Sequence, residues 1–384
     1  MGLELEPTLD PITLVYKTIS TPNPDTDGKP LEIPLHLDVY PPNSRSGGTS
    51  GSGENRTEVP AVVYFHGGGL VVGNRKSWFP EWLHGRLSRR GVAFISADYR
   101  LLSPSTGHDI LEDIQDLFAY IRNDLNSALA EAGGDHGLRI SVDAIAVAGS
   151  SAGGLCAYLS AMHVFPKPRA LLSVYGQAGE CLNDNFLEPK TIPWIPGRDL
   201  VDPSDFTDFI YPQSMSLPIN TGSPLEYYPP THPTPGLPAT KRMYLTRLYY
   251  QLGQWLDYYT GDRTLSERLR QLRSSSSSGK DSTSTIDPTK AREVIGEENV
   301  GLFPQFGVTE NWPPALVIHG SEDAQVQLDE SKHLVEKLKA VGVESKLIVV
   351  DGHGHTFDYA PSAERKFGRL FDRATEFLVQ SLQK

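Results

Sequence analysis

The sequence predicts an α/β protein with a mostly parallel, doubly wound sheet, helices on both faces and an inserted, mainly helical cap. Apolar strands alternate with helical stretches in two separate parts of the chain. The run Ala61–Phe65 is continuously apolar, as a parallel strand buried on both faces requires. Between Glu180 and Gly301 the alternation stops and Pro, Tyr and Trp become frequent, which indicates an insertion into one sheet.

Residues 1–179 are expected to form the first part of the core. In the predicted strand 33–40, Ile33, Leu35, Leu37 and Val39 share one face, while His36 and Asp38 share the other. Residues 43–57, rich in Gly, Ser and Arg, are predicted to form a mobile loop. The elements expected in this part are strands at 12–19, 33–40, 61–65, 92–96, 144–148 and 170–175, and helices at 82–90, 109–125 and from 155.

Residues 180–301 are expected to form the cap, and residues 302–384 the second part of the core. The predicted cap contains a helical piece near 243–259 and a flexible low-complexity segment at 274–285. Its aromatic residues are expected mainly to build a small core, with some lining a substrate pocket; they are Trp194, Tyr211, Tyr227, Tyr228, Trp255, Tyr258 and Tyr259. The second core part is expected to contain strands at 315–319 and 346–350 and helices at 328–341 and 363–382.

Composition excludes some classes of partner. A formal charge of −12 over 384 residues argues against nucleic acid or an anionic membrane as the main partner. The first residues, Met1–Pro7, do not resemble a signal peptide, and no window is apolar enough for membrane insertion. Two cysteines make a disulfide framework unexpected. We therefore expect a cytoplasmic protein.

The motif Gly149-Ser150-Ser151-Ala152-Gly153 is the most informative stretch of the chain. It lies between a predicted strand and a predicted helix, where a G-x-S-x-G motif exposes its serine on a sharp turn as a nucleophile. Gly149 and Gly153 would flank backbone that is too crowded for side chains. Taken alone, the motif also fits a glycine-rich turn with a helix-capping serine.

A glycine-rich loop, His66-Gly67-Gly68-Gly69, follows the predicted strand 61–65. Its glycines would let the backbone approach a ligand, and its amides could point at a developing oxyanion. A phosphate-binding loop is the weaker alternative, because neither P-loop nor dinucleotide-binding spacing follows.

Two later loops supply an acid and a histidine. After the strand 315–319 comes His319-Gly320-Ser321-Glu322-Asp323, in which Asp323 is the first candidate to orient a histidine, Glu322 is the second, and a solvated acid is the plain alternative. After the strand 346–350, the segment 351–357 contains His353 and His355. No HExxH motif or cysteine cluster accompanies these histidines, so we expect no metal site.

The order of the candidate residues along the chain favours one mechanism. Ser151, Asp323 and His355 follow the serine–acid–histidine order of one class of serine hydrolase, unlike the chymotrypsin order. Each loop alone is ambiguous. The four loops that follow the strands 61–65, 144–148, 315–319 and 346–350 carry the candidate residues in this order, and such a combination is not expected by chance.

These motifs together resemble the hormone-sensitive-lipase-like branch of the α/β-hydrolase superfamily, the HGGG esterases. The resemblance covers roughly residues 61–175 and 314–384. Its motifs are His66–Gly69, Asp98–Leu101 with Pro104, Gly149–Gly154, His319-Gly320 with Asp323, and His355–Phe357. The chain departs from the family at Leu70, where an aromatic residue is frequent, which leaves the shape of the acyl pocket open.

The resemblance implies Ser151 as nucleophile, His355 as general base and Asp323 as orienting acid. It implies an oxyanion hole formed by the amides of Gly68, Gly69 and Ala152. His355 is favoured over His353 because the family has phenylalanine two residues after its histidine, here Phe357.

We expect a serine carboxylesterase that needs no cofactor and acts on a small, rather hydrophobic ester. The alternatives are a hydrolase dedicated to one specialised metabolite, such as a lactone, thioester or acetyl group, and a non-catalytic small-molecule receptor on the same fold. The receptor is the weaker alternative, because all three triad residues are retained.

Overall fold

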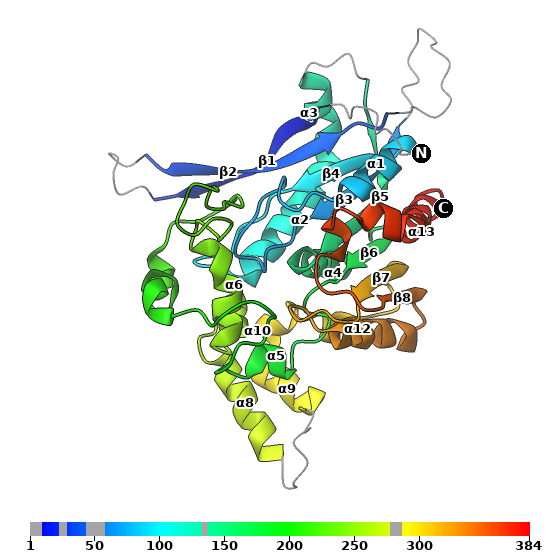
Figure 1. Cartoon of the computed structure of the whole chain (residues 1–384). Coiled ribbons are helices and arrows are strands. Elements are labelled where there is room, and N and C mark those ends of the chain that lie inside the picture. The colour runs from blue at the N-terminus through cyan, green and yellow to red at the C-terminus, as the bar shows by residue number, and fades with distance from the viewer. Residues whose placement is uncertain (1–9, 23–28, 44–57, 133–136, 277–285) are drawn as a thin grey trace.

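The computed structural model describes residues 10–22, 29–43, 58–132, 137–276 and 286–384. Within these residues the strands form one eight-stranded sheet in the order β1-β2-β4-β3-β5-β6-β7-β8 (Figure 1). The strands are β1 Ile12–Thr21, β2 Leu31–Tyr40, β3 Val59–Phe65, β4 Ala93–Ala97, β5 Ile140–Ser150, β6 Leu171–Val174, β7 Ala315–Gly320 and β8 Ser345–Val350.

The sheet is antiparallel at β1–β2 and β2–β4, and parallel from β4 to β8. Its central strands are buried on both faces, which explains why β3 is continuously apolar from Ala61 to Phe65 and why β4 has Ser96 as its one polar residue. Val63 of β3 lies opposite Ile95 of β4 on one side and Val147 of β5 on the other. All of the parallel strands therefore end at one edge of the sheet, where the candidate loops follow them.

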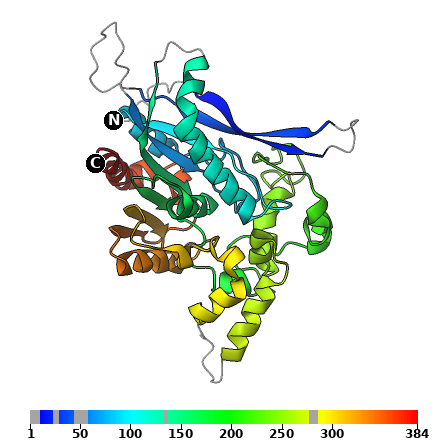
Figure 2. The same cartoon turned by 180° about the vertical axis from the view of Figure 1, so that it is seen from behind.

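Helices cover both faces of the sheet, as Figures 1 and 2 show from opposite sides. The buried apolar side chains form two clusters. Helices α1 and α13 contribute to one cluster, while α2, α4 and α12 contribute to the other. The core helices are α1 Glu81–Arg89, α2 Gly107–Asn123, α3 Leu125–Glu131, α4 Ala152–His163, α12 Leu328–Ala340 and α13 Ala363–Leu382. A short 3₁₀ helix, η3 Phe357–Tyr359, precedes α13. The predicted mostly parallel sheet with helices on both faces is confirmed.

Between β6 and β7 the described chain contains only helices, turns and isolated bridges. Of these helices, α8 and α9 lie at the end of the molecule farthest from α3 (Figures 1 and 2). The helices between β6 and β7 are α5 Asp184–Leu187, η1 Pro203–Phe209, η2 Gln213–Ser216, α6 Arg242–Gln251, α7 Trp255–Thr260, α8 Leu265–Ser276, α9 Pro288–Ile295, α10 Glu297–Val300 and α11 Pro304–Gly307.

Three expected elements differ from the structure. The expected helix 109–125 ends at Asn123, because the backbone of Asp124 leaves the helical conformation before α3 begins. The expected helical piece 243–259 is two helices, α6 and α7, separated at Gly253, which has a φ of 62°. The segment 274–285 was expected to be flexible, yet Ser274 lies in the last turns of α8 and donates a hydrogen bond to the Arg270 carbonyl.

Parts of two predicted loops cannot be compared with the structure. The predicted mobile loop 43–57 lies outside the described residues from position 44, and the low-complexity segment does so over 277–285.

Candidate active site

Ser151 lies on the sharp turn between β5 and α4. Its φ of 53° and ψ of −125° are strained for a residue with a side chain. A Cβ on Gly149 would lie 2.0 Å from the Gly153 carbonyl oxygen, and one on Gly153 would lie 2.0 Å from the Phe65 carbonyl oxygen. Only glycine fits both positions, so the small residues of the motif are what allow this turn to form.

Three predicted residues from three loops lie within hydrogen-bond distance of one another. The Ser151 Oγ is 3.0 Å from His355 Nε2, and His355 Nδ1 is 2.6 Å from Asp323 Oδ2. A neutral imidazole protonated at Nδ1 satisfies both contacts, because Ser151 then donates to Nε2 and Nδ1–H donates to the carboxylate. Ser151 is half-buried, and the side chains of His355 and Asp323 are largely buried.

Asp323 is held as a carboxylate by its surroundings. Burial alone raises the pKa of this carboxyl group, but hydrogen bonds from His319, His355 and the Val326 amide outweigh burial and hold the pKa well below its usual range. The Oδ1 atom also accepts from the amide of Gln325, at 2.9 Å. Oδ2 remains directed at the histidine, so the acid fixes the imidazole orientation.

His319 supports Asp323 from behind, a role that the sequence analysis did not assign. Its Nε2 lies 2.9 Å from the Val326 carbonyl oxygen and 3.4 Å from Asp323 Oδ2. Its Nδ1 lies 2.7 Å from the hydroxyl of Ser331, which can donate to it. His319 is the last-but-one residue of β7 and is fully buried, and its contact with Asp323 arises from tertiary packing rather than from a local sequence pattern.

The imidazole of His355 packs against Tyr175, another residue that the sequence analysis missed. The two ring centroids are 4.5 Å apart. The Tyr175 hydroxyl donates to Asp358 Oδ1 at 2.5 Å, and Trp82 Nε1 donates to Asp358 Oδ2 at 3.0 Å. Tyr175 follows directly after β6 and has a φ of 41°, so its ring is held by both backbone and hydrogen bond.

The glycine loop after β3 lies beside the Ser151 turn. Gly68 and Gly69 have φ values of 108° and 61°, and a Cβ on Gly68 would lie 2.0 Å from the Val72 carbonyl oxygen. Among the described residues, the amides of Gly68, Gly69 and Ala152 donate no hydrogen bond to another protein group. They are therefore free to bind a ligand oxygen.

His66, at the start of this loop, has a structural environment. Burial lowers the pKa of His66 to about 4, so its ring is neutral near pH 7. Its Nδ1 lies 2.7 Å from the Gly67 carbonyl oxygen, and its ring stacks on Tyr99 with centroids 4.4 Å apart. The ring thus anchors the loop rather than titrating in the working pH range.

A cavity of about 480 Å³ opens onto Ser151 and His355. Its walls come from the core and from the segment between β6 and β7, and they combine apolar and aromatic side chains with polar and charged ones. The apolar and aromatic lining residues include Val72, Trp78, Trp194, Ile195, Leu225, Tyr227, Met243, Tyr244, Tyr250 and Tyr359.

The aromatic residues singled out in the predicted cap lie in three environments. Trp255, Tyr258 and Tyr259 are buried in the core, and Tyr211 stacks on Tyr258 with centroids 4.4 Å apart. Trp194 and Tyr227 line the cavity. Tyr228 stacks on His232 instead, with centroids 3.8 Å apart.

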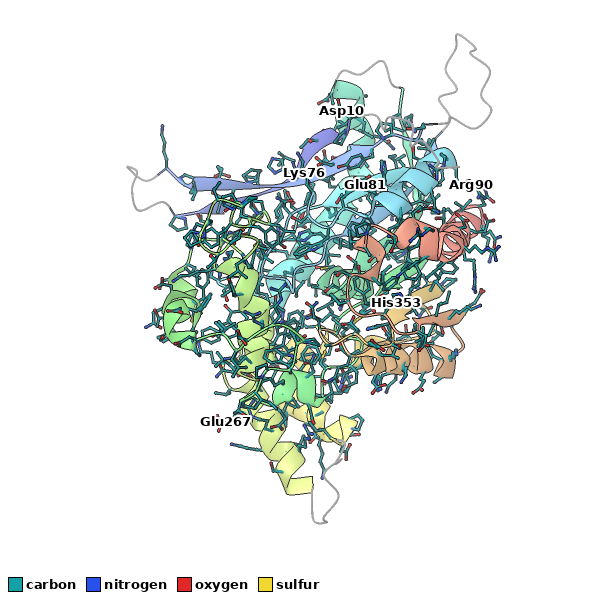
Figure 3. All side chains as sticks on the ribbon, in the orientation of Figure 1. Asp10, Lys76, Glu81, Arg90, Glu267 and His353 are labelled. Carbon is teal, nitrogen blue, oxygen red and sulfur yellow. The ribbon has the colours of Figure 1, made fainter. Side chains whose placement is uncertain are left out.

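The remaining candidates lie away from the reacting groups. Glu322 is exposed. His353 (labelled in Figure 3) packs its ring against Phe367 of α13, with centroids 5.0 Å apart, and its Nδ1 lies 2.6 Å from the Asp351 carbonyl oxygen. Leu70 is fully buried in the core and does not line the cavity. The aromatic position that the family resemblance implied is therefore directed away from the pocket.

Among the described residues, no group of three or more His, Cys, Asp or Glu side chains is arranged to hold a metal ion. None of the described helices combines the length and the apolar character that crossing a bilayer requires.

Family models match two parts of the chain. Residues 62–191, which include the glycine loop and the Ser151 turn, match the model described as alpha/beta hydrolase fold. Residues 255–384, which include Asp323 and His355, match the model of the prolyl oligopeptidase family.

Curated relatives fall into two groups. A probable carboxylesterase from Phoma sp. is 30% identical over 120 residues, and lipase 2 from Moraxella sp. is 29% identical over 141 residues. The non-reducing polyketide synthase pkbA from Emericella nidulans is 25% identical over 366 residues, or 91% of this chain. The chain spans 37% of the length of the carboxylesterase, 30% of the lipase and 13% of the synthase.

Solved structures share the architecture of this chain. Esterase 2 from Thermogutta terrifontis, phosphonylated by sarin, has a TM-score of 0.52 at 18% identity and covers 96% of this chain and 94% of its own. An alpha/beta hydrolase superfamily protein from Enterococcus faecalis has a TM-score of 0.51 at 15% identity and covers 94% of this chain and 99% of its own. At these identities the likeness establishes the fold.

The chain therefore has the α/β-hydrolase fold, as the sequence predicted. Within that fold, the resemblance to the esterases that was inferred from motifs is confirmed by the matches to a carboxylesterase and a lipase.

Proposed function

We propose that this protein is a serine hydrolase that cleaves a small, rather hydrophobic carboxylic ester through an acyl-enzyme intermediate. The observation that carries the proposal is the hydrogen-bonded series Ser151–His355–Asp323 at the wall of a 480 Å³ cavity. A cavity of this size suits a small-molecule substrate, and the apolar and aromatic side chains in its mixed lining favour a hydrophobic acyl or alcohol group.

The first half of the reaction forms the acyl-enzyme. His355 Nε2 removes the Ser151 proton as Oγ attacks the ester carbonyl, and Asp323 stabilises the resulting imidazolium. The amides of Gly68, Gly69 and Ala152 donate hydrogen bonds to the oxyanion of the tetrahedral intermediate. His355 then gives its proton to the leaving alcohol oxygen.

Water completes the cycle. It loses a proton to His355 as it attacks the acyl carbonyl, and collapse of the second tetrahedral intermediate returns the proton to Ser151 and releases the acid. These steps need only this chain's own groups and water.

We also propose that residues 180–301 act as a cap that defines the substrate site, with 1–179 and 302–384 as the two parts of the core. This division is supported by the cavity, whose walls combine Ser151 and His355 with Trp194, Tyr244 and Tyr250.

The proposal is tested with a fluorophosphonate probe and a panel of p-nitrophenyl esters of increasing acyl length. We expect mass spectrometry to locate the adduct on Ser151 and Ser151→Ala to lose at least 10⁴-fold in kcat, as removal of a triad member typically does. Ser274→Ala, which changes an exposed serine on α8, is the matched control. An adduct on another residue, or an active Ser151→Ala variant, would overturn the proposal.

A second candidate is a hydrolase dedicated to one specialised metabolite, such as a lactone, thioester or acetyl ester. It is favoured by the polyketide synthase relatives, which match 85–91% of this chain. Labelling of Ser151 by the probe together with slow turnover of every p-nitrophenyl ester would favour this candidate over a generalist esterase.

A further inference from the structure

Helix α6 presents one face to the cavity and another to the core. Met243, Thr246, Arg247 and Tyr250 line the cavity, and their spacing of three, four and seven residues places them on one side of the helix. Leu245, Leu248 and Tyr249 are buried in the core. A positively charged side chain therefore stands among the apolar and aromatic groups that would surround a substrate.

Arg247 differs from the other arginines of the described chain. Each of the others that is not exposed pairs with carboxylates or with backbone carbonyl groups. Arg242, on the same helix, donates to the carbonyl oxygens of Val71, Leu102 and Ser103. Arg247 makes no hydrogen bond or ion pair with described residues, and its Nε is buried. Its guanidinium carbon lies 5.4 Å from the ring centroid of Tyr244.

The electrostatic surroundings leave this guanidinium uncompensated. Burial lowers the pKa of Arg247, and the positive charge of Arg198 lowers it further, while Tyr244 and Asp199 act in the opposite direction. Arg198 and Asp199 also line the cavity, and both are exposed. Two arginines and one aspartate give this wall a net charge of +1. One bound monoanion would neutralise it.

Helix α6 contacts the proposed oxyanion loop at the residue that precedes Arg247. A Cβ on Gly69 would lie 1.9 Å from Thr246 Oγ1, which is itself 3.4 Å from the Gly68 carbonyl oxygen. The backbone of Arg247 follows about 3.8 Å farther along the chain, so its position is fixed by a neighbour that packs on the loop. Arg247 and the loop glycines line the same cavity.

We infer that the ester substrate carries a carboxylate, which pairs with Arg247 while its ester carbonyl lies at Ser151. This inference rests on the proposed function and narrows it to half-esters and related acid esters. A guanidinium pairs with a planar carboxylate through two parallel hydrogen bonds, and such charge-assisted bonds are strong when partly buried. Arg198 adds attraction from the exposed rim of the cavity.

The kinetic test compares matched esters that differ by one charge. The charged substrates are the mono-p-nitrophenyl esters of glutarate, adipate and suberate, and the neutral ones carry a methyl ester on the second carboxyl group. We expect kcat/KM to favour the charged member at least tenfold for one or more lengths, in the range of a charged hydrogen bond. Arg247→Gln should bring that ratio close to one, while Arg373→Gln, at an exposed site on α13, should retain it.

The binding test does not depend on turnover. Calorimetry on Ser151→Ala should show the monomethyl esters of the same diacids binding at least tenfold more tightly than the dimethyl esters, and Arg247→Gln in that background should remove the difference. Thermal unfolding confirms that each variant is folded.

The two tests separate failure of the inference from failure of the proposed function. A wild-type enzyme that hydrolyses both members equally at every length overturns the carboxylate inference and leaves the esterase proposal standing. A wild-type enzyme that hydrolyses neither overturns the esterase proposal, and the binding ratio then decides the inference. A preference that persists in Arg247→Gln also overturns the inference.

Discussion

Replacing Asp323 with asparagine tests the electrostatic part of the proposed triad. His355 Nδ1 lies 2.6 Å from Asp323 Oδ2, and the carboxylate side chain is buried. For charge centres about 4 Å apart, an effective dielectric constant of about 20 gives an attraction of about 4 kcal/mol once the imidazolium forms. Because 1.36 kcal/mol corresponds to a tenfold change in rate, this loss lowers kcat by about 10³-fold.

The asparagine also has a chemical consequence. If its amide NH₂ faces Nδ1, the histidine must carry its proton on Nε2, where it can no longer accept the Ser151 proton. The same substitution in the serine protease template lowers kcat by about 10⁴-fold, so we expect a loss between about 10³- and 10⁴-fold.

The assay for Asp323→Asn is steady-state hydrolysis of p-nitrophenyl butyrate near pH 8. We expect kcat to fall while KM changes little, because Asp323 does not line the cavity. Glu322→Gln, the exposed neighbour in the same loop, is the matched control and should stay within about twofold of wild type. A folded Asp323→Asn enzyme that retains more than a tenth of its kcat would refute the reasoning.

Three further predictions concern the supports of the site. Gly153→Ala should lower the free energy of unfolding by about 1–3 kcal/mol or more, because the new Cβ would lie 2.0 Å from the Phe65 carbonyl oxygen. Chemical denaturation measures this loss, and a variant as stable as wild type would contradict the prediction. Tyr175→Phe should lower the free energy of unfolding by about 1–3 kcal/mol, because it leaves Asp358 Oδ1 buried without its hydrogen-bond donor. It should also lower kcat. A loss of stability with unchanged kcat would show that the tyrosine does not position His355. Burial raises the pKa of Asp257 from 3.8 to about 6, so its charged form destabilises the fold as pH rises through that interval. Below about pH 4, Asp257→Asn should therefore have the same free energy of unfolding as wild type. Above about pH 7, it should be more stable than wild type by at most about 3 kcal/mol. Chemical denaturation at both pH values measures the difference, and a variant that is less stable than wild type above about pH 7 would contradict the prediction.

The fold could be predicted from sequence because local patterns and tertiary contacts agree in the core. The run Ala61–Phe65 is apolar at every position since β3 lies between β4 and β5 and is covered on both faces. The helix 363–382 was predicted with the bounds that α13 has, since its apolar residues recur on one face that packs on the sheet. Gly149 and Gly153 could be recognised because no other residue fits their turn.

The rest of the site depends on contacts that leave no local pattern. Tyr175 and His319 support His355 and Asp323 from β6 and β7, and their roles arise only when those strands become neighbours. Asp38 was expected merely to share a face with His36, yet it is buried because Arg75 reaches it from another loop, with Nε 2.9 Å from Oδ1. The spacing of these residues along the chain carries no information about such pairs.

Helix α6, which lies between β6 and β7, joins the proposed substrate site to the proposed oxyanion loop. Arg242 fastens its first turn to the carbonyl oxygens of Val71 and Leu102, close to the glycine loop, and Thr246 packs directly on Gly69. Because Gly69 has a φ of 61° and no room for a side chain, a shift of α6 would move the backbone whose amides are proposed to bind the oxyanion. Substitutions on the cavity face of α6 should therefore alter both KM and kcat, whereas substitutions of exposed residues on α8 should alter neither. We therefore propose that the segment between β6 and β7 does more than cover the cavity, and that it also shapes the proposed oxyanion site.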